Sequence, residues 1–308
     1  MFDTPIRHAA TKVPGERGYA SEWNADHIIT EEDKAKRSVT IIIAASNSKD
    51  KTKADYVCDG VADEVEIQTA INLLISGGRI ILLEGTYNIA TNITMGNDII
   101  LEGQGWNTIL SFTGAGTGSD YYYFIMKNKS RIVIRDLKFS FGHAGESKEG
   151  HIDIAGATDI TFENILFEKN LGSVQAILRE SSDEKSIRIT IKNCRYTTIN
   201  GGEISEGFWC ELTEYAKIIN NNGTNETPLF SYIAGETIKY SLIHGNRNIG
   251  DIVLQTGCIR NTITSNYLTT GTIRLDAGAN YNTVVANVVD TAVINNGTGN
   301  EVAHNAIF

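Results

Sequence analysis

Apolar and polar residues alternate in short segments along most of the chain after residue 79. Each segment has five or six residues and ends at Asn, Asp or Gly, and ten such segments recur at 80–85, 98–103, 131–136, 159–164, 188–193, 215–220, 241–246, 261–266, 282–287 and 300–305. Alternation with period two predicts β-strands. Recurrence at intervals of 18 to 33 residues predicts a repeat architecture.

The shortest intervals decide which all-β architecture fits best. An interval of 18 to 21 residues accommodates one turn of three short strands with tight corners, so the sequence predicts a right-handed parallel β-helix of about ten turns. The alternative is a β-sandwich, which predicts hairpin turns such as Asn-Gly between strands and does not predict one corner residue repeated in ten units. At a strand spacing of about 4.8 Å, ten turns form a rod on the order of 45 Å long.

Asparagine at the repeated corner has a structural explanation. The chain has 27 asparagines, 15 of them after residue 200. Stacked asparagines can bond to their neighbours in adjacent turns and form a ladder along the axis. The residue after each corner is expected to continue an inward stack, formed by Leu137, Ile165, Cys194, Tyr267, Val288 and Ala306.

The region before the repeats divides into an arm and a cap. Residues 1–38 mix charged residues with Gly and Pro and lack an apolar period, which predicts an arm or attachment segment, and residues 39–308 form the second unit. Residues 62–76 have apolar residues near helical spacing, at Val65, Ile67, Ile71 and Leu74, after Asp63 as a candidate N-cap. This helix is expected to end at Gly77-Gly78 and to cover the open end of the core.

Composition and charge exclude several functions. The formal charge of −10 over 308 residues disfavours binding to nucleic acid or to anionic lipid. No run of 18 apolar residues exists and residues 1–20 lack an apolar signal segment, so we expect no membrane insertion and synthesis in a cytoplasm. The four cysteines are widely spaced and the histidines form no zinc motif, so we expect buried thiols, no metal and no cofactor.

Two segments resemble a known group of proteins. Ala54 to Glu64, continuing through Ile71-Asn72, Gly77 to Ile80 and Glu84 to Tyr87, looks like the entry segment of pectate-lyase-like parallel β-helix proteins, which include bacteriophage tailspikes and minor tail proteins. Gly18 to His27 is similar to short leaders of phage tail fibres. The resemblance implies a virion protein that assembles as a homotrimer, contacts other tail proteins through residues 1–38, and binds or cleaves host-surface polysaccharide. The chain departs from large tailspikes in lacking a separate C-terminal trimerisation domain, since Glu301 to Phe308 still has the pattern of a β-helix turn.

The long intervals point to a candidate site. Turns that end between residues 136 and 246 hold 26 to 33 residues, so they carry insertions, which in β-helices build the binding face. A second strand is expected before each Asn-corner segment. If its more apolar column points inward, the outward residues are Asp153, Arg179, Trp209, Glu211, Tyr232, Gln255, Arg274 and Asp276. Aromatic rings can stack on sugars while carboxylates transfer protons.

The chemistry that this set predicts is glycoside hydrolysis by two carboxylates. Glu211 is the candidate acid and Asp153 the candidate base, about 10 Å apart across two turns, near the separation of inverting enzymes. Glu203, Glu206 and Asp276 are further catalytic candidates, and Arg179, Trp209, Tyr232, Gln255, Arg274 and Tyr122 are candidate substrate-binding residues. Alternating charges at Arg131, Asp159 and Arg188, and at Arg135, Glu163 and Lys192, are interpreted as structural pairs between turns.

Three functions are compatible with these residues. The chain is a tailspike that binds and cleaves host polysaccharide, with hydrolysis favoured over elimination, or a non-catalytic receptor-binding tail protein on the same scaffold. The third is a cellular lyase of the pectate-lyase type, which the arm and the missing signal segment disfavour. No D-x-D-x-D cluster marks the calcium site that such a lyase needs.

Overall fold

The computed structural model describes residues 39–112, 122–142, 147–170, 173–180, 184–199, 203–210, 212–223, 233–234, 237–247 and 250–307. Only the backbone is described at residues 39, 147–151, 173–176, 179–180, 203, 205–206, 209–210 and 233–234. The predicted arm, residues 1–38, lies outside the described residues, and the first strand begins at Val39.

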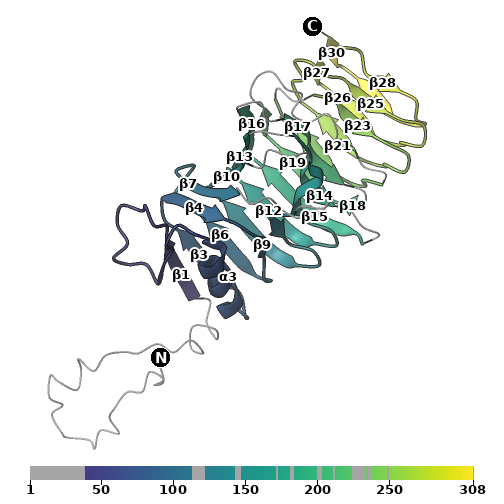
Figure 1. The fold of residues 1–308 in the computed structure, drawn as a ribbon. Coiled ribbons are helices and arrows are strands. Elements are labelled where there is room, and N and C mark those ends of the chain that lie inside the picture. The colour runs from purple at the N-terminus through teal and green to yellow at the C-terminus, as the bar shows by residue number, and fades with distance from the viewer. Residues whose placement is uncertain are drawn as a thin grey trace, which may run out of the picture.

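The described chain winds into a rod of parallel strands (Figure 1). The longest sheet, sheet A, has thirteen strands: β1 (Val39–Ala44), β2 (Tyr56–Val57), β3 (Gly78–Leu82), β6 (Ile99–Glu102), β9 (Ser130–Arg135), β12 (Thr158–Glu163), β15 (Ser186–Lys192), β18 (Thr213–Glu214), β19 (Lys217–Ile219), β22 (Leu242–His244), β24 (Thr262–Thr264), β26 (Thr283–Val285) and β29 (Glu301–Ala303). Each of the ten predicted segments contributes one strand to it, from β3 to β29, so the predicted parallel β-helix is confirmed.

Two further sheets complete each turn. Sheet B contains β4 (Gly85–Ile89), β7 (Thr108–Phe112), β10 (Lys138–Phe141), β13 (Leu166–Asn170), β16 (Arg195–Ile199) and β20 (Asn222–Gly223), and β27 (Val288–Val289) pairs with β30 (Ala306–Ile307). Sheet C contains β5 (Ile93–Thr94), β8 (Phe124–Ile125), β11 (Ser147–Asp153), β14 (Ser173–Glu180), β17 (Glu203–Cys210) and β21 (Ile233–Ala234), followed by β23 (Ile252–Leu254), β25 (Ile273–Leu275) and β28 (Ile294–Asn295).

The core follows from the alternation within each strand. One inward column of sheet A is continuous from turn to turn: Ile41, Ile80, Leu101, Ile134, Phe162, Ile191, Ile218, Ile243, Ile263 and Val284. All ten are buried. Because branched aliphatic side chains fit a pleated surface covered on its inner side, the same residue type recurs at this position.

Aromatic rings fill the broader turns on the sheet B side. Phe167 stacks on Phe139 with ring centroids 5.6 Å apart and on Tyr196 at 5.0 Å. A neighbouring pair, Phe112 and Phe141, is stacked at 5.2 Å. Rings at these separations add to the free energy of burial, so these aromatic contacts stabilise the core on the sheet B side.

The asparagines occupy two different positions in the turn. The sequence pattern treated them as one position, whereas the corner and the ladder are consecutive residues. Asp136, Asn164, Asn193 and Asn220 have φ between 52° and 56° and form the corner. The ladder lies one residue later and contains the buried residues Asn221, Asn246, Asn266 and Asn287 and the partly exposed Asn305. Short polar residues tolerate the left-handed backbone, which explains Asn and Asp at the corner. Asn164 Nδ2 also donates to Asp136 Oδ1 at 2.6 Å, so these two corner residues are bonded between turns.

The offset also changes the predicted inward stack. Leu137, Ile165 and Cys194 are buried as expected, and the ladder asparagines continue their column. Tyr267 is exposed, Val288 is partly exposed and Ala306 is exposed, so these three assignments were wrong. In the C-terminal turns the position after the corner is filled by asparagine, and the following residue points outward.

A second ladder runs along the other edge of the same strands. The Asn261 side chain accepts a hydrogen bond from the Ser241 N–H and donates through Nδ2 to Asn282 Oδ1 at 3.0 Å. Asn282 repeats the arrangement with Asn300, at 3.2 Å. Each C-terminal strand of sheet A is therefore bracketed by two buried amide ladders, which satisfy the backbone N–H groups where the strands end.

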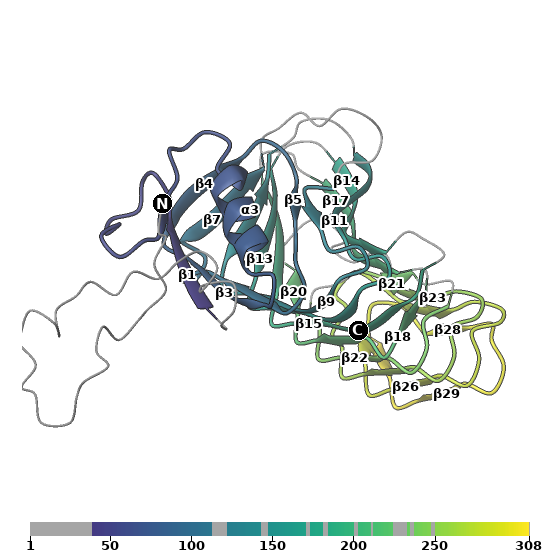
Figure 2. The same ribbon diagram turned by 90° about the horizontal axis from the view of Figure 1, so that it is seen from below.

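Helix α3 (Glu64–Leu73) covers the N-terminal end of the core, as expected (Figure 2). Ile67, Ile71 and Leu74 are buried, whereas Val65 is exposed and Ala70 takes its expected place. Asp63 precedes the helix without capping it through its side chain. Its carboxylate accepts hydrogen bonds from the Gly60 and Asn88 N–H groups instead, so it joins the loop to strand β4.

Ion pairs cross the outer face of sheet A between adjacent turns. Arg188 Nε and Nη2 donate to the two Asp159 oxygens at 2.5 and 2.7 Å, and Lys192 Nζ lies 3.0 Å from Glu163 Oε1. Arg131 makes the same bidentate arrangement with Asp98. The structural interpretation of these alternating charges is confirmed.

Glu102 provides a stability prediction, because it is the most buried acid of this network. Burial opposes its ionisation, but hydrogen bonds from Arg79 and Arg135 outweigh burial and lower the pKa of Glu102 below 4.5. Since the folded pKa is depressed, the stabilisation is present above pH 4.5 and is lost as pH falls through the folded value. Glu102→Gln should lower the free energy of unfolding by roughly 2 kcal/mol at neutral pH. In a series of urea denaturations at different pH, the loss of stability towards acid pH should be smaller in the variant. An acid limb identical to that of the wild type would contradict this assignment.

Three cysteines, Cys58, Cys194 and Cys258, are buried free thiols, as the sequence predicts, and burial raises the pKa of each to about 12. The Cys210 side chain lies outside the described part of the chain. Among the described residues, no helix combines the length and apolarity needed to cross a membrane.

Candidate functional site

The backbone register of sheet C brings three of the predicted site residues together. Asp153 on β11 pairs with Arg179 on β14, and Arg179 pairs with Trp209 on β17. These strands belong to the turns with the longest insertions. An acid, a cation and an aromatic residue thus occupy one column across three adjacent strands. The sequence analysis selected all three as outward residues but paired Asp153 with Glu211 as the two catalytic acids.

Asp153 is the member of this column whose side chain is described. It lies between the inward residues Ile152 and Ile154, so alternation places it on the outer face, yet only 7% of it is exposed. Its Oδ1 accepts a hydrogen bond from the Ala155 N–H at 2.9 Å. This bond fixes the carboxylate at the C-terminal end of β11, at the side of the rod where the long strands β11, β14 and β17 lie together (Figure 2).

The other predicted acids are not placed beside Asp153. Glu211 and Tyr232 lie outside the described residues, and for Glu203 and Glu206 the structure gives the backbone position on β17 alone. The predicted pairing of Asp153 with Glu211 therefore stays a prediction.

The C-terminal candidates are separated from Asp153 along the rod. Arg274 and Asp276 form an ion pair with each other, with Nε 2.9 Å from Oδ1, on and just after β25. Five strand steps separate β11 from β25, about 24 Å at the usual strand spacing. Gln255, after β23, is one step closer. All three residues are partly exposed, as their selection as outward residues predicts. Asp276 lies too far along the rod to act with Asp153 on one glycosidic bond, and the substrate-binding roles of Gln255 and Arg274 stay predictions.

The remaining aromatic candidate, Tyr122, is partly exposed just before β8. Its neighbour Tyr123 is buried and packs on Phe112, with ring centroids 5.1 Å apart. Tyr122 therefore lies on the N-terminal side of the Asp153 column, one strand away from β11.

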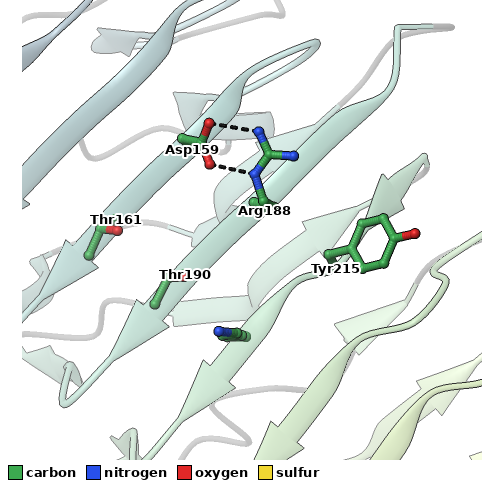
Figure 3. A pocket seen from close by; sticks show the side chains of 6 residues that line it. Asp159, Thr161, Arg188, Thr190 and Tyr215 are labelled. Atoms are coloured by element: carbon green, nitrogen blue, oxygen red, sulfur yellow. Dashed lines mark hydrogen bonds and ion pairs between the residues drawn. The ribbon is translucent and has the colours of Figure 1, made fainter.

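A second surface feature, on sheet A, was not selected from the sequence as a site. A shallow open pocket of about 420 Å³ lies on the outer face of strands β12, β15 and β19 (Figure 3). Its lining comes from three successive turns: Asp159, Thr161, Arg188, Thr190, Tyr215 and Lys217. Asp159 and Arg188 bind each other along one wall, and Tyr215 occupies the next position of the same column.

The chemistry of this pocket differs from that of the Asp153 column. Its one carboxylate among the lining residues is neutralised by Arg188, which lowers the pKa of Asp159 through hydrogen bonding. Lys217 is exposed, and no carboxylate of the described residues lies within ion-pair distance of it. The pocket can therefore attract an anion or a polyhydroxylated ligand, but it has no free carboxylate in its lining for proton transfer.

Comparison with known proteins gives structural similarity at low sequence identity. The sequence matches no protein-family model and no curated protein. Among solved structures, the alginate lyase from Paenibacillus sp. str. FPU-7 has 15% identity and a TM-score of 0.46, over 87% of this chain and 99% of that one.

Two viral proteins are also similar. ORF18 of Geobacillus virus E2 has 14% identity and a TM-score of 0.36, over 78% of this chain and 58% of that one. Tailspike protein 3 of bacteriophage CBA120 has 11% identity and a TM-score of 0.26, over 85% and 60%. These values concern architecture alone and carry no argument about chemistry. With stacked parallel strands on its sides and a helix over one end, the chain has the fold of a parallel β-helix.

Proposed function

We propose that this protein binds host-surface polysaccharide on the outer face of sheet C and cleaves it, as a tailspike-like component of a virion. The observation that supports the proposal is the column of Asp153, Arg179 and Trp209 on three adjacent strands. A Trp ring offers a sugar an apolar face, Arg offers a fork of donors for hydroxyl or carboxylate groups, and Asp transfers a proton. Assembly as a homotrimer and attachment to other tail proteins through residues 1–38 belong to the same proposal and rest on the sequence resemblance.

The proposed reaction is hydrolysis with Asp153 as the general base. Asp153 removes a proton from a water molecule, the water oxygen attacks the anomeric carbon, and the glycosidic C–O bond breaks. A second carboxylic acid, for which we propose Glu211, donates a proton to the departing oxygen. The hydrogen bond from the Ala155 N–H supports this role, because it fixes the position of the carboxylate at the end of β11.

The test is turnover of host-surface polysaccharide by the purified full-length chain. New reducing ends without ultraviolet absorbance of an unsaturated product indicate hydrolysis, and both signals together indicate elimination. Asp153→Asn should lower kcat at least about 100-fold, the lower range for general acid–base groups, without changing the thermal midpoint by more than a few degrees. Trp209→Ala should raise KM and leave kcat within a few-fold.

Asp276→Asn is the matched control, because Asp276 is an acid on the same side of the rod but remote from Asp153. It should leave kcat and KM unchanged. Wild-type turnover by the Asp153→Asn variant would refute the proposed base.

A specific observation favours a second candidate, a non-catalytic receptor-binding protein on the same scaffold. With 7% exposure and a hydrogen bond to its own turn, Asp153 is suited to hold the backbone at the end of β11. In that case the purified protein binds host cells, Trp209→Ala weakens the binding, and no cleavage product forms with the wild type.

A further inference from the structure

One edge of sheet A has an unusual backbone along the whole rod. Ten positions in register have positive φ: Gly77, Asp98, Arg131, Asp159, Arg188, Tyr215, Tyr240, Arg260, Tyr281 and Gly299. Eight of them are not glycine, and left-handed backbone is rare for residues as large as Tyr and Arg. The repeated conformation aims the side chains of this column along the outside of the rod, one above the other.

The column changes character halfway along the rod. Its N-terminal half consists of two self-neutralising pairs, Arg131 with Asp98 and Arg188 with Asp159. In its C-terminal half the acids are replaced by tyrosines. The rings of Tyr215 and Tyr240 stack with centroids 5.2 Å apart and an interplanar angle of 15°.

Arg260 extends the aromatic stack by one turn. Its guanidinium carbon lies 5.9 Å from the Tyr240 ring centroid, and its Nη1 donates to Tyr240 Oη at 3.3 Å. Tyr281 follows in the next turn. Tyr215, Tyr240 and Tyr281 remain 47%, 39% and 63% exposed, so three large rings and one cation are held in order at the surface. We call Tyr215, Tyr240, Arg260 and Tyr281 the tyrosine strip.

The pocket of Figure 3 opens at the first residue of this strip. Tyr215 is shared by both, and Lys217 extends from the same strand region beside it. Lys217 and Arg260 are both exposed, and neither has a carboxylate within ion-pair distance among the described residues. On a chain with net charge −10, this leaves a local excess of positive charge next to ordered aromatic rings.

We infer that the tyrosine strip and its pocket bind an anionic glycan chain at a site separate from sheet C. Ring edges and exposed faces of the tyrosines contact the sugars, and the Thr161 and Thr190 hydroxyls lie in the pocket for sugar hydroxyls. Carboxylate or sulfate groups of the glycan bind Lys217 and Arg260, whose positions are two turns, about 10 Å, apart along the axis. The free carboxylate that cleavage requires is missing from the lining, so the strip holds the polymer and leaves it intact.

The inference is independent of catalysis on sheet C, and binding measurements test it directly. The probes are hyaluronan and dextran sulfate as anionic glycans, neutral dextran, and oligo-dT as a polyanion without a glycan backbone. Isothermal titration at ionic strength of about 0.15 M limits unspecific attraction. The wild type should bind both anionic glycans and neither dextran nor oligo-dT.

The variants separate the strip from the overall charge and from the proposed active site. The double variant Lys217→Ala with Arg260→Ala should weaken binding at least tenfold, and Tyr215→Ala at least fivefold. Lys53→Ala removes one exposed positive charge at the N-terminal end of the rod and should bind like the wild type. Asp153→Asn should also retain full binding, because it affects the other face.

Each other outcome overturns the inference. Equal affinity of the Lys217/Arg260 double variant, or absence of binding to either anionic glycan, excludes this ligand class. Binding of oligo-dT as tight as that of hyaluronan means that the strip attracts any polyanion. Loss of binding in Asp153→Asn places the glycan on sheet C alone.

Discussion

Asn266→Ala is expected to lower the free energy of unfolding by roughly 4 kcal/mol. Asn266 Oδ1 accepts hydrogen bonds from the N–H and the Nδ2 of Asn246, at 3.0 and 2.9 Å. Its own Nδ2 donates to Ile243 O and to Asn287 Oδ1, both at 3.0 Å. Truncation removes all four bonds and leaves a buried backbone N–H without an acceptor, and such groups cost about 1–3 kcal/mol each. Urea denaturation followed by circular dichroism measures the change.

Asn305→Ala is the matched control for that experiment. Asn305 is the last residue of the same ladder and is partly exposed, so the groups that it leaves can bond to water. Its loss should cost about 1 kcal/mol. Hydrogen exchange adds a local readout, since the Asn246 amide should lose protection in Asn266→Ala and keep it in Asn305→Ala. Equal destabilisation by the two substitutions would show that ladder position has no effect.

Lys169→Met is expected to stabilise the protein by about 3 kcal/mol near neutral pH. Lys169 lies inside sheet B, in register between Phe141 and Thr198, and is fully buried. Burial lowers the pKa of Lys169 from 10.5 to about 8, because desolvation disfavours the ammonium form. A change of one unit in pKa corresponds to about 1.4 kcal/mol. At pH 7 the lysine is protonated in both the folded and the unfolded chain, so the weaker proton binding in the folded chain lowers the free energy of unfolding.

The pH dependence identifies the cause. Between the folded value of about 8 and the unfolded value of 10.5, the unfolded chain binds more protons than the folded one, so stability rises with pH across this range. Lys169→Met should remove that rise in stability with pH. Its stabilisation relative to the wild type should be smallest at the alkaline end of this range. Lys127→Met, at an exposed lysine, should change neither the stability at neutral pH nor the slope. Destabilisation of Lys169→Met at neutral pH would mean that the lysine is required in the core.

The repeat could be predicted because every turn obeys the same local rule. Each of the ten segments supplies one strand of sheet A, since alternation and a polar corner recur whatever the loop between them. The cap could be predicted from helical spacing, although Val65 points outward and Ala70 inward. Placing the more apolar column inward selected Asp153, Arg179 and Trp209 as outward residues, but their register across the three strands came from the structure alone.

The failures have one physical origin, the change in turn length along the rod. Asn220 and Asn246 end equivalent segments in the sequence, but they differ in the structure. Asn220 is a left-handed corner residue, whereas Asn246 is a buried ladder residue and bonds to Asn221. The pocket at Tyr215 was not predicted, because nothing in the sequence indicates that a tyrosine has positive φ. Lys169 lies in a segment whose polar residues, Glu168 and Asn170, suggest an exposed strand end.

The paired amide ladders have a consequence for how such a rod changes in length. Within the C-terminal turns, each ladder asparagine bonds to the equivalent asparagine of the next turn, and Asn261 and Asn282 mark the same position one turn apart. A tandem copy of residues 261–281 would therefore give every asparagine the same partners on both sides. It would lengthen the rod by one strand spacing, about 4.8 Å, without a new kind of contact. Duplication of one C-terminal turn would thus change the length of the rod in a fixed increment while leaving the longer turns before it unaltered.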